Sequence, residues 1–310
     1  MSPRGKTLPE RDNAAAAEPR PSALTCCPIA IDHRSMLEIA AALALVAAQG
    51  QALELAYSDE AGLASVEAQW EGHRFPLAKH DTRWIAVVGV DLDAKAGAHS
   101  AEITFRYRDG RSRGIREPVT VKTQKFPTTE LKVEDRYVEL SPEDAARAAR
   151  EAKETDAIYA TLTTECYWNE PFVAPIHGAK DGRNFGHRRV FNGQPRAPHA
   201  GADLHADVGT PVYASNRGRV VLAKDLFYSG NAVIVDHGLG VYTMYLHLSK
   251  IDVAPGAIVE RGQRLGLAGA TGRVTGPHLH WGVRIFDARV DPFSLLKLEA
   301  PPPAGPDRKD

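Results

Sequence analysis

The sequence has only three cysteines in 310 residues, Cys26, Cys27 and Cys166. Three cysteines cannot build a disulfide framework or a four-thiolate zinc site, so any metal site must use histidine and carboxylate side chains. The chain also lacks an excess of one charge, because 38 Lys and Arg residues face 39 Asp and Glu residues. It therefore has no overall basic field that would attract nucleic acid. These shortages direct attention to the twelve histidines.

The apolar run Leu37–Ala48 is too short for a membrane-spanning helix of about 20 residues. Together with the small residues that follow it, the run resembles a secretory signal peptide with a cut after Ala52. We therefore expect residues 1–52 to be a disordered lead and a signal peptide, with Met36 as a possible true start. An Ala-rich amphipathic helix is the alternative. The signal peptide predicts a periplasmic or secreted protein without a stable membrane span.

The length suggests about two domains. Between residues 53 and 130 the chain contains short strand-like runs, including the apolar run Trp84–Val90. Ile103, Phe105 and Tyr107 alternate with polar residues, which is typical of a half-buried strand. No catalytic spacing occurs here. We predict a β-sandwich-like accessory domain over residues 53–130.

A linker over residues 131–170 is predicted to contain a helix at about 141–162. Ser141 and Pro142 form its start, as N-cap and first-turn proline, and acidic residues follow near the positive end of the helix dipole. Glycine and strand-length runs then dominate residues 171–300, which predicts a second β-rich domain. Residues 301–310 are expected to be a disordered tail. The predicted fold is thus mainly β in both domains.

Eight of the twelve histidines lie between residues 177 and 280. His199 and Asp203 are four residues apart, with Gly201 between them. His278 and His280 are spaced i and i+2, which on a strand turns both side chains to one face. His247 ends a strand-like run, and in a regular strand it would share a face with Tyr245.

This set of side chains suits zinc. A catalytic zinc site has three protein ligands and an open position for water. Two neutral imidazoles and one carboxylate leave a charge of +1 at the metal, which acidifies the water and polarises a carbonyl. No glutamate accompanies these histidines as in the H-E-x-x-H helix, so a histidine would have to transfer protons.

The spaced motifs over about residues 185–295 resemble those of the lysostaphin/LytM-type zinc metallopeptidases, which cut peptide bonds in peptidoglycan. The matching segments are His199-Ala-Gly-Ala-Asp203, Gly209-Thr-Pro-Val-Tyr-Ala214, Val235-Asp-His-Gly238, Tyr245-Leu-His-Leu-Ser249, Gly269-Ala-Thr-Gly272 and Thr275-Gly-Pro-His-Leu-His-Trp281. The lead-in Phe191–His199 is similar to the Gram-negative branch of that family.

The resemblance implies that His199, Asp203 and His280 bind one zinc ion per catalytic domain. It also implies that a metal-activated water attacks the scissile carbonyl and that His278 and His247 are the catalytic residues. One of them would act as the general base and the other would stabilise the oxyanion. The resemblance does not say which histidine has which role. The implied partner is the stem peptide of peptidoglycan, with no nucleic acid, and we expect a monomer. The cross-link expected for this branch joins D-alanine to a diamino acid.

Two other functions stay open. Some relatives lose these residues and only activate cell-wall amidases, so a non-catalytic LytM-type regulator is the main alternative. A zinc hydrolase of ordinary proteins has the same site chemistry. Arg188 and Arg189 could bind substrate carboxylates or could simply be solvated charges at the surface. We expect His205 to lie at the surface and His237 to have a structural role.

Overall fold

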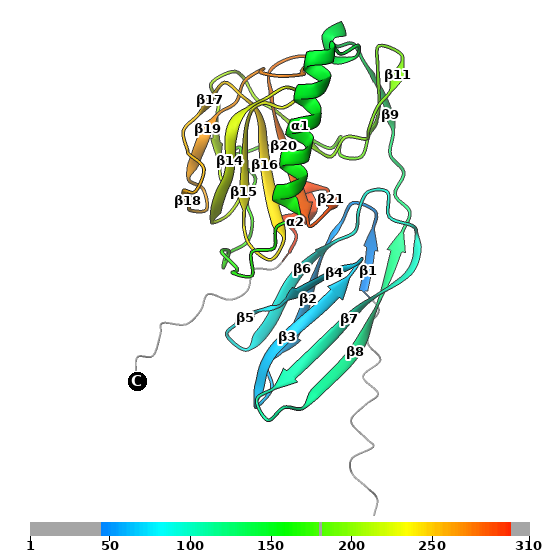
Figure 1. Ribbon diagram of the computed structural model, residues 1–310, viewed down its shortest axis with the longest axis vertical. Helices are drawn as coiled ribbons and strands as arrows, with labels where there is room; N and C mark the ends of the chain where they lie inside the picture. The colour runs from blue at the N-terminus through cyan, green and yellow to red at the C-terminus, as the bar shows by residue number, and fades with distance from the viewer. Residues whose placement is uncertain (1–44, 180–181, 299–310) are drawn as a thin grey trace, which may run out of the picture. The chain divides into compact units, whose positions relative to one another are not determined.

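The computed structural model describes residues 45–179 and 182–298. The structure is mainly β, which confirms the predicted fold class, and α1 (Pro142–Tyr159) and α2 (Pro292–Leu295) are its α-helices in this range (Figure 1). No helix in the described residues is long and apolar enough to cross a membrane. Most of the expected signal peptide, the expected tail, Cys26 and Cys27 lie outside the described residues.

Two sheets form the N-terminal part. The first has the strand order β1-β8-β7-β3-β4 and the second the order β2-β6-β5. The strands of the first sheet are β1 (Leu45–Ala48), β3 (Leu63–Trp70), β4 (His73–Pro76), β7 (Gly97–Tyr107) and β8 (Ser112–Lys122). Those of the second are β2 (Ala52–Ser58), β5 (Ala78–His80) and β6 (Arg83–Gly89). The predicted strands at residues 84–90 and 103–107 are β6 and β7, and their apolar side chains belong to one buried cluster.

The structure places part of the expected signal peptide inside this fold. β1 pairs in parallel with β8, with Ala47 opposite Val121, and Ala47 is buried. The backbone amide of Gly50 donates to the carbonyl of Val90. A cut after Ala52 would remove this strand and its pairing.

Helix α1 begins where the sequence predicts, because the Ser141 hydroxyl accepts a hydrogen bond from the amide of Asp144 at 3.1 Å. It ends at Tyr159, three residues earlier than expected. Ile158 and Tyr159 pack against a buried cluster formed by β14 (Gly218–Leu226), β15 (Gly230–Asp236) and β16 (Val241–Leu248). Arg147 forms an ion pair with Asp225. Figure 1 shows the helix running beside these strands.

A seven-stranded sheet carries the C-terminal part, in the order β12-β20-β16-β15-β14-β18 with β21 paired to β20. Its strands are β12 (Gly201–His205), β14 (Gly218–Leu226), β15 (Gly230–Asp236), β16 (Val241–Leu248), β18 (Ile258–Val259), β20 (His278–Ile285) and β21 (Ala288–Val290). A second, three-stranded sheet is formed by β13 (Pro211–Tyr213), β17 (Lys250–Ile251) and β19 (Arg264–Leu267). Apolar residues of both sheets, such as Val212, Leu265 and Trp281, fill one core.

A third small sheet lies next to the candidate site. It consists of β9 (Thr128–Leu131), β10 (Arg188–Phe191) and β11 (Gln194–Pro195), with β10 in the middle. β9 runs parallel to β10, and Thr129 lies opposite Arg189. Residues 128–131, which were expected to belong to the accessory domain and the linker, thus pair with β10, the strand that precedes His199.

Candidate metal centre

The pairing of β12 with β20 brings two of the predicted metal ligands together. Asp203 lies directly opposite His280, and His205 lies opposite His278. Because side chains alternate along a strand, residues 203, 205, 278 and 280 share one face, whereas Leu204 and Leu279 are fully buried in the core behind it. His199 lies two residues before β12.

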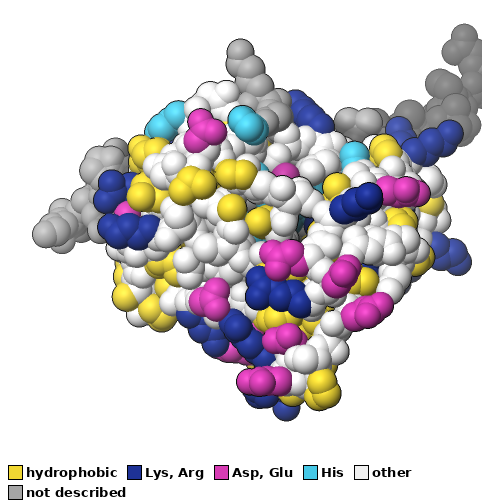
Figure 2. All heavy atoms as spheres, turned by 90° about the horizontal axis from the view of Figure 1, so that it is seen from above, with side chains coloured by type: hydrophobic (Ala, Val, Ile, Leu, Met, Phe, Trp, Pro, Cys, Tyr) yellow, Lys and Arg dark blue, Asp and Glu magenta, His cyan; other side chains and the backbone are white. Residues whose placement is uncertain are grey.

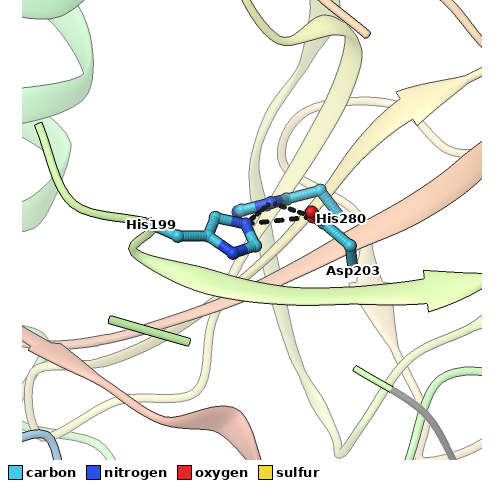
Figure 3. Close-up of side chains that lie close together, drawn as sticks. All are labelled: His199, Asp203 and His280. Atoms are coloured by element: carbon cyan, nitrogen blue, oxygen red, sulfur yellow. Dashed lines mark hydrogen bonds and ion pairs between the residues drawn. The ribbon is translucent and has the colours of Figure 1, made fainter. Parts of the chain in front are cut away.

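The side chains of His199, Asp203 and His280 point toward one another (Figure 3). Nε2 of His199 lies 2.9 Å from Nδ1 of His280 and 3.0 Å from Oδ1 of Asp203. Nδ1 of His280 lies 2.9 Å from the same Oδ1. Three ligands bound tetrahedrally at zinc distances are about 3.3 Å apart. Two imidazole nitrogens and a carboxylate oxygen at these separations suit a zinc ion in type, number and spacing.

A backbone contact fixes the orientation of His199. Its Nδ1 lies 3.0 Å from the carbonyl oxygen of Asn184, which can only accept a hydrogen bond. Nδ1 must therefore carry the proton, and Nε2 presents its lone pair to Asp203 and His280. A neutral imidazole held in this tautomer is a metal ligand that needs no rearrangement.

The carboxylate of Asp203 is held in place through Oδ2, the oxygen that does not face the histidines. Oδ2 accepts hydrogen bonds from Nδ2 of Asn184 at 2.9 Å and from Arg189 at 3.1 Å. Oδ1 is left facing His199 and His280. Asn184 was not among the predicted site residues, because no motif spacing marks it.

His247 reaches the site by a departure from regular strand geometry. In β16, Tyr245 is opposite Trp281 and fully buried, and its hydroxyl accepts a hydrogen bond from the amide of Ser215. The register with β15 shifts just beyond this point, and His247 has a positive φ of 66°. Such a bulge redirects a side chain. The expectation that His247 shares a face with Tyr245 was wrong.

His247 and His278 lie side by side at the edge of the triad formed by His199, Asp203 and His280. Their ring centres are 4.9 Å apart, and the His247 ring is 6.0 Å from that of His280. Nδ1 of His247 donates to the carbonyl of Thr271, and Nδ1 of His278 donates to that of Gly276, both at 2.9 Å. Nε2 is therefore the lone-pair nitrogen of both rings, and in His278 it lies 3.6 Å from Oδ1 of Asp203.

Burial controls the charge of these groups. It lowers the pKa of His199 to about 4, and it lowers the pKa of His247 to about 3 with the help of the neighbouring His280 and His278. Burial alone would raise the pKa of Asp203, but its close contacts with the side chains of His199 and His280 hold it well below its usual range. At neutral pH the site therefore holds uncharged imidazole at His199 and His247 and a carboxylate at Asp203, as a divalent cation requires.

Two adjoining cavities open on this cluster. The smaller, of about 50 Å³, is lined by His247, His278 and Arg273 among others, and the larger, of about 380 Å³, by His199 and Asn184 among others. Both are bounded by Leu131, Arg189, Asp203, Thr275 and His278. One wall is thus supplied by the end of β9, a segment that no sequence motif connects with the site.

The remaining candidate residues are not metal ligands. Arg189 binds Asp203, and Arg188 forms an ion pair with Asp93, so each arginine meets a carboxylate of its own chain. His237 is fully buried between the carbonyl of Arg217 and the hydroxyl of Thr243. His205 is exposed. Burial raises the pKa of the Cys166 thiol to about 12, so it is not a nucleophile at neutral pH.

The face shown in Figure 2 carries basic and acidic side chains interspersed with one another. This distribution agrees with the balanced composition of the chain.

The model of peptidase family M23 matches residues 197–292. A solved structure described as a putative peptidase M23 from Pseudomonas aeruginosa is 33% identical, with a TM-score of 0.56, over 80% of this chain and 94% of that one. The chain belongs to peptidase family M23.

Two curated relatives are similar in the same region. The peptidoglycan DD-endopeptidase ShyA of Vibrio cholerae is 48% identical over 38% of this chain and 27% of its own length. The DD-carboxypeptidase/endopeptidase Mpg of Neisseria meningitidis is 44% identical over 31% of this chain and 22% of its own length. The match therefore spans about a quarter of the length of these relatives.

Proposed function

We propose that the protein is a zinc-dependent endopeptidase that hydrolyses peptide cross-links of bacterial peptidoglycan. The observation that carries the proposal is the convergence of His199 Nε2, His280 Nδ1 and Asp203 Oδ1 within 3.0 Å of one another, with His247 and His278 beside them. Membership of peptidase family M23 and the names of the two curated relatives support it.

His199, Asp203 and His280 would hold the zinc ion. When bound, zinc acidifies a water molecule and polarises a carbonyl group. His278 and His247 each present an unprotonated Nε2, which is the atom that a general base needs. In our proposal one of them accepts the proton of the attacking water and passes it to the leaving nitrogen, and the other takes a proton from solvent and stabilises the developing oxyanion.

The proposed substrate is the bond between D-alanine and a diamino acid in the cross-link. Its support is that curated relatives over this region are named DD-endopeptidases. Such a substrate implies a periplasmic or secreted location. We propose that the protein acts as a monomer on the stem peptides.

A non-catalytic regulator that activates an amidase is the competing function. Such a protein does not need two histidines with free lone pairs beside a metal triad, and both are present here. Zinc content separates the two functions, because the enzyme should be purified with about one zinc per chain when chelators are omitted.

The deciding experiment is digestion of purified cross-linked sacculi with the zinc-loaded protein, with and without chelator. Mass analysis of the released muropeptides should show loss of dimers, and chelator or the His278→Ala substitution should prevent it. Unchanged cross-linking by the zinc-loaded protein would contradict the proposal.

A further inference from the structure

Arg273 lies in the loop before β20 and faces the smaller cavity, together with His247 and His278. Its guanidinium carbon is 4.3 Å from the centre of the Tyr228 ring and 4.8 Å from that of Phe191. Two aromatic faces thus hold the planar group in place without using its N–H donors. The guanidinium is positioned before any substrate arrives.

The guanidinium has neither a hydrogen bond nor an ion pair within residues 45–179 and 182–298, although the side chain is largely buried. Burial, together with the neighbouring Arg189 and Arg196, lowers the pKa of Arg273 to about 10, so the group remains charged at neutral pH. Partly buried cations are normally paired. An unpaired one facing a cavity is available to bind an anion from elsewhere.

The two neighbouring arginines already donate hydrogen bonds within the protein. Arg189 binds Asp203, and Arg196 donates to the carbonyl of Val138 and the side chain of Gln194. Asp203 in turn is held by Arg189, Asn184, His199 and His280. Arg273 therefore has its five donors available beside the two histidines to which we assign catalysis.

We propose that Arg273 binds a carboxylate of the substrate, namely the α-carboxylate on the residue whose nitrogen leaves. This inference rests on the proposed function. The cavity shared with His247 and His278 measures only about 50 Å³, so the carboxylate must lie within a few atoms of the reacting bond. Where the diamino acid is a dicarboxylic acid with each amino group α to a carboxyl group, the carbon that carries the scissile nitrogen also carries such a carboxylate. Arg273 would thus be a specificity-determining residue.

Two synthetic cross-linked dimers test this, identical except for a carboxylate or a carboxamide at that carbon. A hydrogen-bonded charged pair contributes about 10- to 100-fold in kcat/KM, so the wild type should prefer the carboxylate dimer by that factor. Arg273→Gln should remove the preference by slowing only the carboxylate dimer. Arg273→Lys, which keeps the charge and guards against misfolding, should retain part of it.

Arg196→Gln is the matched control, because it removes a nearby positive charge that does not line the smaller cavity and whose Nη2 donates to Val138 and Gln194. It should keep the preference. Equal rates for both dimers in the wild type, or an unchanged preference in Arg273→Gln, would overturn the inference.

A binding measurement separates this inference from the proposed function. Calorimetry of the zinc-loaded His278→Ala protein should show tighter binding of the carboxylate dimer, lost when Arg273→Gln is added. This result would stand even if no cleavage were seen with any substrate. Equal affinities, or no binding of either dimer, would refute the role of Arg273.

Discussion

Asn184 binds Asp203 at two points: its Oδ1 accepts the backbone amide of Asp203 at 3.0 Å, and its Nδ2 donates to Oδ2 at 2.9 Å. Its own carbonyl orients His199. Asn184, which lies outside the family match, thus positions two of the three atoms that we assign as metal ligands, namely Nε2 of His199 and Oδ1 of Asp203.

Asn184→Ala should lower zinc affinity by about 10- to 100-fold, because outer partners of metal ligands have effects of this size. Competition with a chelator of known affinity measures it. Asn216→Ala is the control: Asn216 is buried and hydrogen-bonded to Glu170 away from the site, so its loss should reduce stability and leave zinc affinity unchanged. Equal affinity losses in both variants would mean that Asn184 acts only through stability.

His280→Ala should abolish both zinc binding and cleavage, whereas His278→Ala should keep the metal and lose about 10²- to 10⁴-fold in kcat, as expected for loss of an acid or base. Zinc content by atomic absorption and muropeptide release check the two variants together. Full activity of a metal-free His280→Ala protein would refute the ligand assignment.

Gly201→Ala should impair zinc binding although it adds only a methyl group. A Cβ at this position would lie 2.5 Å from Nε2 of His280 and 2.6 Å from the carbonyl of Trp281, so the ligand would have to move. Gly276→Ala is the matched control, since a Cβ there would meet no atom within 4 Å. Zinc titration of both variants should show a clear loss only for Gly201→Ala.

His237 should make stability depend on pH. Burial lowers its pKa in the folded protein to about 4, from the ordinary histidine value of 6.5 that applies to the unfolded chain. Between these values the unfolded chain binds a proton that the folded chain does not, so stability falls as the pH decreases from 6.5 and levels off below 4. The full effect is about 3 kcal/mol.

Urea unfolding of chelator-treated protein between pH 7.5 and 4 measures this dependence. His237→Gln, which can still bind Arg217 and Thr243, should show a shallower loss with acid than the wild type. The same pH slope in both proteins would show that His237 does not contribute.

Sequence patterns predicted the parts of the fold that local physics determines. Alternation identified β7, the capping residue Ser141 identified the start of α1, and the i, i+2 spacing of His278 and His280 gave their common face. These features depend on neighbours in the chain, so the sequence displays them directly.

The remainder depends on contacts between distant residues. The face of His247 could not be predicted because a bulge with positive φ reverses strand alternation there. Leu45–Ala48 has the apolar character of a signal peptide but pairs with β8. Arg189 was a candidate for binding substrate, and only the fold brings it to Asp203. Arg273 is notable only because its guanidinium has no partner among the described residues, and such a contact cannot be read from the sequence.

The strand β9 has a practical consequence for protein engineering. Leu131 and Val133 bound the cleft beside Asp203 and His278, yet they lie more than sixty positions before residue 197, where the family match begins. A fragment trimmed to that match would lose this boundary, together with Asn184 and Arg189. The cleft of such a fragment would have a different shape, and its selectivity would differ from that of the full chain. Fragments made for domain grafting or activity screens should therefore begin upstream of Thr128.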